Sequence, residues 1–138
     1  MPAVAFLGAG SFGTALSIHL ANKGFDVKLW DRKPKLIDEI NNTRKNTKYS
    51  GDIILPKNIT GYKELQEALK GCKFVILSVP SHAIRDICKR IKSIIEEDAI
   101  IINIAKGIEV ETKLRLSQVI NEELDNPVVV LTGPSHAE

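Results

Sequence analysis

AVAFLGAGSFG, residues 3–13, is the stretch that decides the predicted fold. Apolar residues fill positions 3–7, which is typical of a buried parallel strand, and helical spacing begins at Ser11. Gly8, Gly10 and Gly13 therefore lie at a strand-to-helix turn. The first glycine permits the tight turn, the second lets the backbone approach a pyrophosphate, and the third lets the helix pack closely on the strand. The stretch predicts a dinucleotide site at a helix N-terminus.

Apolar stretches alternate with amphipathic segments along the rest of the chain. Further strands are expected at residues 25–30, 72–79, 99–104 and 128–131, with a short one near Ile59 inside a loop. Helices are expected at residues 11–23, from Pro34 onward, at 63–69, after Ser81 as the cap, and at 113–124. Residues 41–51 lack periodicity and predict a basic loop. This alternation predicts an α/β fold: a doubly wound, mostly parallel, Rossmann-like sheet with helices on both faces.

The apolar spacing also predicts which helix faces are buried. In the first helix the inner positions would be Phe12, Ala15, Leu16 and Leu20. In the helix after Ser81 they would be Ile84, Ile87, Cys88, Ile91 and Ile95, with charged residues covering the other side.

Composition excludes several classes of protein. A chain of 138 residues suffices for one domain with its own core, and a net charge of +2 from interspersed charges gives no reason to expect a nucleic acid or membrane partner. Cys72 and Cys88 are too few for a disulfide framework, which favours a reducing compartment. Without a charged leader or an apolar run of about 20 residues, we expect a cytoplasmic protein.

Ligands of doubly wound sheets bind beyond the carboxyl ends of the strands. Five such ends change abruptly from apolar to small, polar or charged residues, so we expect them to line one cleft. They are residues 8–13, 31–33, 78–81, 105–107 and 133–137.

The second of these ends bears on the choice of cofactor. Asp31 follows Gly13 by 18 residues, close to the spacing of about 20 at which an acid binds the ribose 2′-hydroxyl of NAD. Arg32 and Lys33 would instead hold the 2′-phosphate of NADP. In the alternative, Asp31 only caps the following helix and the two cations face solvent. We favour contact of Arg32 with the adenosine end; Tyr49 would flank the adenine, unless it is merely a surface residue of its polar loop.

Lys106 follows an uncharged strand and precedes Gly107, so its ammonium is placed to donate to a substrate or cofactor oxygen. A lysine that simply reaches solvent from a strand end is the alternative, but Gly107 favours a close approach of ligand. The Ser-His pairs at 81–82 and 135–136 do not predict a hydrolase, because no GxSxG turn is present. His82 and Cys88 are six positions apart rather than three or four, so no metal site is expected.

Five motifs, taken in order, carry a resemblance to a known family. They are GAGSFGTALS at 8–17, LWDR at 29–32, VPSH at 79–82, AKGIE at 105–109 and TGPSHAE at 132–138. Together they resemble the N-terminal half of the bacterial NAD(P)-dependent glycerol-3-phosphate dehydrogenases. The resemblance implies reversible hydride transfer between NAD(P)H and C2 of the pair dihydroxyacetone phosphate and sn-glycerol 3-phosphate, which supplies a precursor for glycerophospholipids. It favours NADP, while Asp31 keeps NAD open.

The resemblance, added to the residues above, implies individual roles. Ser11 and Phe12 would meet the pyrophosphate, Pro80 and Ser81 the nicotinamide ribose, and Lys106 would orient and polarise the C2 oxygen. The predicted cofactor ligands are Gly8, Gly10, Ser11, Phe12, Gly13, Asp31, Arg32, Lys33, Tyr49, Pro80, Ser81, Lys106 and Ala137, and the predicted substrate ligands are Lys106, Gly133 and Ser135.

In similar enzymes a second, helical domain carries the general base and the groups that hold the substrate phosphate. We therefore expect residues 1–138 to form the NAD(P)-binding domain, which would bind cofactor but be inactive alone because hydride transfer needs a complete site. A homodimer is one expectation for the full-length enzyme. The alternatives are a dinucleotide-binding or redox-sensing domain without catalysis, and a related hydroxyacid dehydrogenase.

Overall fold

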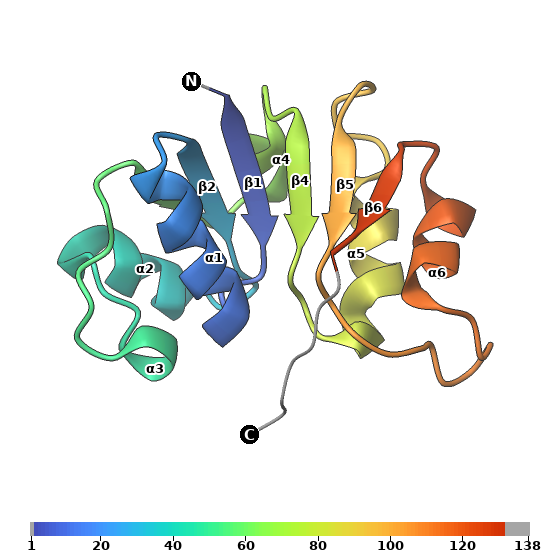
Figure 1. Cartoon of the computed structure of the whole chain (residues 1–138), viewed down its shortest axis with the longest axis horizontal. Coiled ribbons are helices and arrows are strands. Elements are labelled where there is room, and N and C mark those ends of the chain that lie inside the picture. The colour runs from blue at the N-terminus through green and yellow to red at the C-terminus, as the bar shows by residue number, and fades with distance from the viewer. Residues whose placement is uncertain (1, 132–138) are drawn as a thin grey trace.

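Within residues 2–131, which are the residues that the structure describes, six parallel strands form one sheet. This computed structural model orders them as β3 (Ile59–Tyr62), β2 (Asp26–Trp30), β1 (Ala3–Leu7), β4 (Phe74–Leu77), β5 (Ile100–Asn103) and β6 (Val128–Val130) (Figure 1). Every neighbouring pair is parallel. The chain winds outward from β1 to β3, then crosses to β4 and winds the other way. The predicted doubly wound sheet is confirmed.

Helices cover both faces of this sheet (Figure 1). On one face lie α1 (Ser11–Asn22), α2 (Pro34–Thr43) and the short α3 (Thr47–Ser50); on the other lie α4 (Leu65–Leu69), α5 (Ile84–Ile91) and α6 (Leu116–Glu123). Alternate side chains of β1 serve the two faces: Val4 and Phe6 pack with α1 and α2, and Leu7 packs with α4, α5 and α6. Burial on both sides explains why the strands are apolar throughout.

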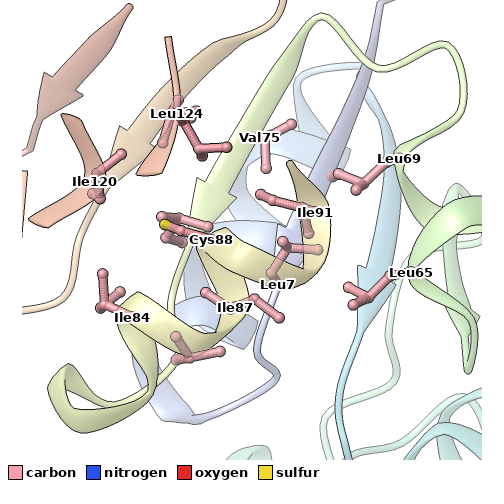
Figure 2. Close-up of a cluster of buried hydrophobic side chains, with 14 of the residues drawn as sticks. Leu7, Leu65, Leu69, Val75, Ile84, Ile87, Cys88, Ile91, Ile120 and Leu124 are labelled. Carbon is pink, nitrogen blue, oxygen red and sulfur yellow. The ribbon is translucent and has the colours of Figure 1, made fainter. Parts of the chain in front are cut away.

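The core beneath α5 follows the predicted helical spacing as far as Ile91, where the helix ends (Figure 2). The prediction is wrong for Ile95, which lies beyond the helix and is only partly buried. Ile84, Ile87, Cys88 and Ile91 are buried in one cluster with Leu7 of β1. Burial raises the pKa of the Cys88 thiol to about 12. The thiol is therefore protonated at neutral pH and serves as an apolar packing group.

The predicted buried face of α1 is partly wrong. Phe12 is 59% exposed and Ala15 is also exposed, whereas the buried residues of this helix are Gly13, Thr14, Ser17 and Ala21. The reason is the close approach of α1 to the sheet. A Cβ on Gly13 would lie 2.7 Å from Ser78 Oγ and 2.9 Å from the Gly8 carbonyl oxygen, so the facing surface of the helix consists of small residues and excludes large apolar ones.

The predicted loop at 41–51 is also wrong in part. α2 continues to Thr43 and ends at Arg44, which has a left-handed backbone with φ of 60°. The Arg44 guanidinium donates to the carbonyl oxygens of Pro56 and Ile59 and so ties this end of α2 to the start of β3. The short helix α3 follows. The two hydrogen bonds from the Arg44 side chain therefore stabilise the turn at the end of α2, which no periodic pattern in the sequence indicates.

Two helices, α5 and α6, begin later in the chain than the sequence predicts. Ser81 does not cap a helix with its side chain; it opens the 3₁₀ turn η1 (Ser81–Ala83), which precedes α5. The last helix begins at Leu116 rather than near residue 113, because Lys113 has φ of 64° and Ile108 forms an antiparallel bridge with Arg115. The chain between β5 and α6 therefore folds back on itself before the helix begins.

Candidate functional site

A cleft of about 450 Å³ opens at the carboxyl ends of β1, β2, β4 and β5, where the winding direction of the sheet reverses. Four of the five predicted strand ends contribute to it. Its lining includes Gly8, Gly10, Asp31, Arg32, Lys33, Tyr49, Pro80, Ser81 and Lys106, along with Trp30, Ser78 and Arg90. The fifth strand end, with Gly133, Ser135 and Ala137, lies outside the described residues.

The glycine turn, residues 8–10 between β1 and α1, lines this cleft. Gly8 has φ of +117°, and a Cβ there would lie 2.8 Å from the backbone carbon and oxygen of Ser78. Its N–H donates to the Trp30 carbonyl oxygen at 2.7 Å. Gly10, immediately before α1, differs: a Cβ there would meet nothing within 4 Å. Gly8 and Gly13 therefore serve the turn and the packing, and Gly10 leaves open space at the helix N-terminus.

Three side chains to which the sequence gave no individual role brace this turn. The Ser78 hydroxyl donates to the Gly8 carbonyl oxygen at 2.7 Å. The Ala9 carbonyl oxygen accepts from Thr14 Oγ1 at 3.1 Å and from Asn46 Nδ2 at 3.0 Å. Thr14 and Asn46 are completely buried. Asn46 Nδ2 also donates to Thr14 Oγ1 at 3.1 Å, so partners that are distant in the sequence account for the burial of this polar side chain.

The adenosine end of the cleft would lie beyond β2. Arg32 and Lys33 are exposed there, and Tyr49, half-buried on α3, lines the same wall. The residue that caps α2 is Lys33, without a side-chain bond to the helix. Asp31 therefore does not cap that helix; its carboxylate accepts from the Ala9 and Lys33 N–H groups, both at 2.9 Å.

The opposite wall carries Lys106, exposed just after β5. Gly107 has φ of +109°, and a Cβ there would come within 4.0 Å of Ser81 Cβ. The segments that follow β4 and β5 are thus neighbours at this end. Lys106 also lines an adjoining hollow of about 380 Å³ beside Arg115, so this residue borders two open spaces.

Among the described residues, 2–131, three predicted ligands are outside the lining of the cleft. Ser11 and Phe12 are exposed on the first turn of α1, and Gly13 is buried against Ser78. The N–H groups of this first turn have no partners within the helix, as at every α-helix start. Contact between Ser11 or Phe12 and a pyrophosphate therefore stays a prediction.

Comparison with known families agrees with this geometry. A family model described as the N-terminus of NAD-dependent glycerol-3-phosphate dehydrogenase matches residues 3–138. The chain belongs to this family. The resemblance drawn from the five sequence motifs is therefore confirmed.

Relatives in the glycerol-3-phosphate dehydrogenase family are similar over the whole chain. The glycerol-3-phosphate dehydrogenase [NAD(P)+] of Clostridium perfringens is 63% identical over 100% of this chain and 42% of its own length, and that of Clostridium tetani is 56% identical over 98% and 39%. A crystal structure of glycerol-3-phosphate dehydrogenase from Coxiella burnetii matches with a TM-score of 0.91 and 34% identity, over 98% of this chain and 42% of that one. The chain thus spans about two fifths of the length of such relatives.

Two features are absent from residues 2–131, the part of the chain that the structure describes. None of the helices there is both long and apolar enough to cross a membrane. The same residues contain no group of three or more His, Cys, Asp or Glu side chains arranged to hold a metal ion.

An ion-pair cluster fixes the AKGIE segment that carries Lys106. Arg85 of α5 forms a two-pronged bond with Glu109, with Nε to Oε2 at 2.7 Å and Nη2 to Oε1 at 2.9 Å. The same guanidinium contacts Glu122 at 2.8 Å and Glu123 at 2.7 Å on α6. Arg85 therefore joins α5, α6 and the segment after β5, and a planar guanidinium suits this arrangement where a lysine would not.

The Arg85 cluster predicts a pH-dependent stability. Hydrogen bonds from Arg85 and Thr112 lower the pKa of Glu109 from its ordinary value of 4.5 to about 2. Because the folded-state pKa is the lower one, the stabilisation is complete above pH 4.5 and is lost as pH falls toward 2. We expect Glu109→Gln to lower the melting temperature at pH 7 and to differ less from wild type at pH 3, measured by circular dichroism.

The matched control is Glu111→Gln, which removes an exposed carboxylate two positions along the same segment. It should leave the melting temperature close to that of wild type at both pH values. A constant difference between Glu109→Gln and wild type across this pH range would show that the ionised Glu109 does not contribute as described.

Proposed function

We propose that this chain is the NAD(P)-binding part of an oxidoreductase that interconverts sn-glycerol 3-phosphate and dihydroxyacetone phosphate. The observation that carries the proposal is the single cleft that unites the glycine turn with Lys106 at the switch point of the sheet. The family match supports the same reaction, and relatives 63% identical are named glycerol-3-phosphate dehydrogenase [NAD(P)+]. The family match also favours this reaction over those of related hydroxyacid dehydrogenases.

The residues present fit a dinucleotide. The open side of Gly10 leaves room for a pyrophosphate at the N-terminus of α1, where N–H groups and the helix dipole favour anions. Arg32, Lys33 and Tyr49 would hold the adenosine end, and Pro80 and Ser81 the nicotinamide ribose. When bound, the nicotinamide ring supplies or accepts the hydride.

Lys106 would act at the reacting end of the cleft. Its ammonium would donate to the C2 oxygen of the substrate, orienting the carbonyl and stabilising negative charge on that oxygen during reduction. Gly133 and Ser135 would contact the same substrate. We further propose that residues 1–138 form the cofactor domain and that the rest of the longer enzyme supplies the general base and the phosphate-binding groups. The sn-glycerol 3-phosphate formed by the reduction would serve as a precursor of glycerophospholipids.

The test is reduction of dihydroxyacetone phosphate by NADPH or NADH, followed by absorbance, with the full-length enzyme and with this chain alone. Turnover by the full-length enzyme and cofactor binding without turnover by this chain would support the proposal. Full-length protein that binds cofactor tightly but does not turn over the substrate would favour the redox-sensing alternative. Substantial turnover by this chain alone would contradict a general base located in the rest of the enzyme.

We propose a preference for NADP, carried by Arg32 and Lys33. Arg32→Ala should raise the Kd for NADPH about five-fold, since a charge-assisted contact with the 2′-phosphate is lost at an exposed site. The Kd for NADH should change less than about two-fold, because NADH lacks that phosphate. Calorimetric titration measures both constants.

Lys35→Ala removes another exposed cation, located on α2 and outside the lining of the cleft. This control should leave both dissociation constants at the wild-type values. Unchanged NADPH affinity in Arg32→Ala would show that the 2′-phosphate lies elsewhere.

A further inference from the structure

Both carboxylate oxygens of Asp31 are directed at backbone donors of the protein itself. Oδ2 accepts from the Ala9 N–H at 2.9 Å, and Oδ1 accepts from the Lys33 N–H at 2.9 Å. An acid that selects NAD at this position of the fold accepts a hydrogen bond from the ribose 2′-hydroxyl. Each oxygen of Asp31 instead already accepts one hydrogen bond from the protein, Oδ2 from the turn that would hold the pyrophosphate and Oδ1 from the start of the neighbouring segment.

The bond from Ala9 to Asp31 fixes the second of the two peptide groups that flank the Ala9 α-carbon. On the carbonyl side, the Ala9 oxygen accepts from the buried side chains of Thr14 and Asn46. On the amide side, Asp31 is the acceptor. Both the N–H and the carbonyl oxygen of Ala9 are therefore hydrogen-bonded to side chains. These bonds fix the backbone that leads to Gly10 and to the open space beside it.

The charged residues at the adenosine end differ in their exposure and in their hydrogen bonds. Asp31 is half-buried and engaged with the backbone, whereas Arg32 and Lys33 are exposed along the cleft. Hydrogen bonds from backbone N–H groups to a carboxylate are strong, charge-assisted ones. They stabilise the negative charge of Asp31 at the turn, and the two cations are the groups presented to the ribose 2′ position.

We infer that Asp31 is a positioning residue of the glycine turn and not the acid that selects NAD. It supports the binding of NAD and NADP alike, and discrimination between them falls to Arg32 and Lys33. This inference rests on the proposed function, because it takes the cleft to hold a dinucleotide.

The test compares dissociation constants of NADH and NADPH for wild type, Asp31→Ala and Asp31→Asn. Trp30, the single tryptophan of the chain, lines the cleft, and its fluorescence reports binding. Asp31→Ala should raise both constants about ten-fold and keep their ratio within about two-fold of wild type. Asp31→Asn should recover part of the affinity for both cofactors, since its amide oxygen still accepts from the Ala9 N–H.

Asp26→Ala is the matched control, because Asp26 is exposed at the other end of β2; it should bind both cofactors as wild type does. A shift of about ten-fold or more in the ratio toward NADPH, in either variant and with NADPH affinity maintained, would identify Asp31 as the selecting acid and overturn the inference. Asp31→Asn decides the question if Asp31→Ala does not fold. Wild-type chain that binds neither cofactor would instead overturn the proposed function, and the inference with it.

Discussion

Replacing Lys106 with methionine is expected to lower kcat for dihydroxyacetone phosphate reduction by about 100-fold or more in the full-length enzyme. Methionine keeps much of the apolar length of lysine but has no ammonium to donate to the C2 oxygen. Because Lys106 is exposed at the end of β5 and makes none of the bonds that brace the glycine turn, the melting temperature should stay near that of wild type. Steady-state kinetics and thermal unfolding of the same preparation measure the two effects.

A lysine on a surface remote from the cleft provides the comparison for Lys106. Lys92, exposed just after α5, is not among the lining residues, and Lys92→Met should retain wild-type kcat. If Lys106→Met lowered kcat less than about three-fold, the ammonium would not contribute to the transition state in the way proposed.

Gly8→Ala is expected to destabilise the fold by about 3 kcal/mol or more. Its φ of +117° is strained for alanine, and the added Cβ would lie 2.8 Å from the Ser78 carbonyl carbon and oxygen. These are backbone atoms of the residue just after β4, whose N–H donates to the Leu7 carbonyl oxygen at 3.0 Å. Neither the strain nor the clash can be relieved by a side-chain rotation. Urea unfolding monitored through Trp30 fluorescence measures the loss of stability.

Gly10→Ala is the matched substitution two residues along. A Cβ there has nothing within 4 Å, and φ of −75° suits any residue, so stability should stay within about 1 kcal/mol of wild type. Affinity for NADH and NADPH should nevertheless fall, because the methyl group occupies the space proposed for the pyrophosphate. Equal loss of stability in the two variants would contradict the division of roles between these glycines.

The sequence by itself determined the architecture and the general position of the site. Continuous apolar runs that alternate with segments of helical spacing are typical of strands buried on both faces, so the doubly wound parallel sheet followed from local pattern. In such a sheet all strand ends point to one edge. Asp31, Pro80 and Lys106 could therefore be assigned to one cleft without coordinates, and the structure places all three in its lining. The five motifs were specific enough to indicate the family.

The tertiary structure alone decided what individual side chains do around that cleft. The bonds from Ala9 to Asp31 and Asn46 join residues 22 and 37 positions apart, and Arg85 reaches Glu109 and Glu123 across 24 and 38 positions. No periodicity encodes such pairs, because hydrogen-bond partners depend on how distant segments meet in space. For the same reason the inner face of α1 was mispredicted: hydrophobicity placed Phe12 inside, but the closeness of the helix to Ser78 allows only small residues there.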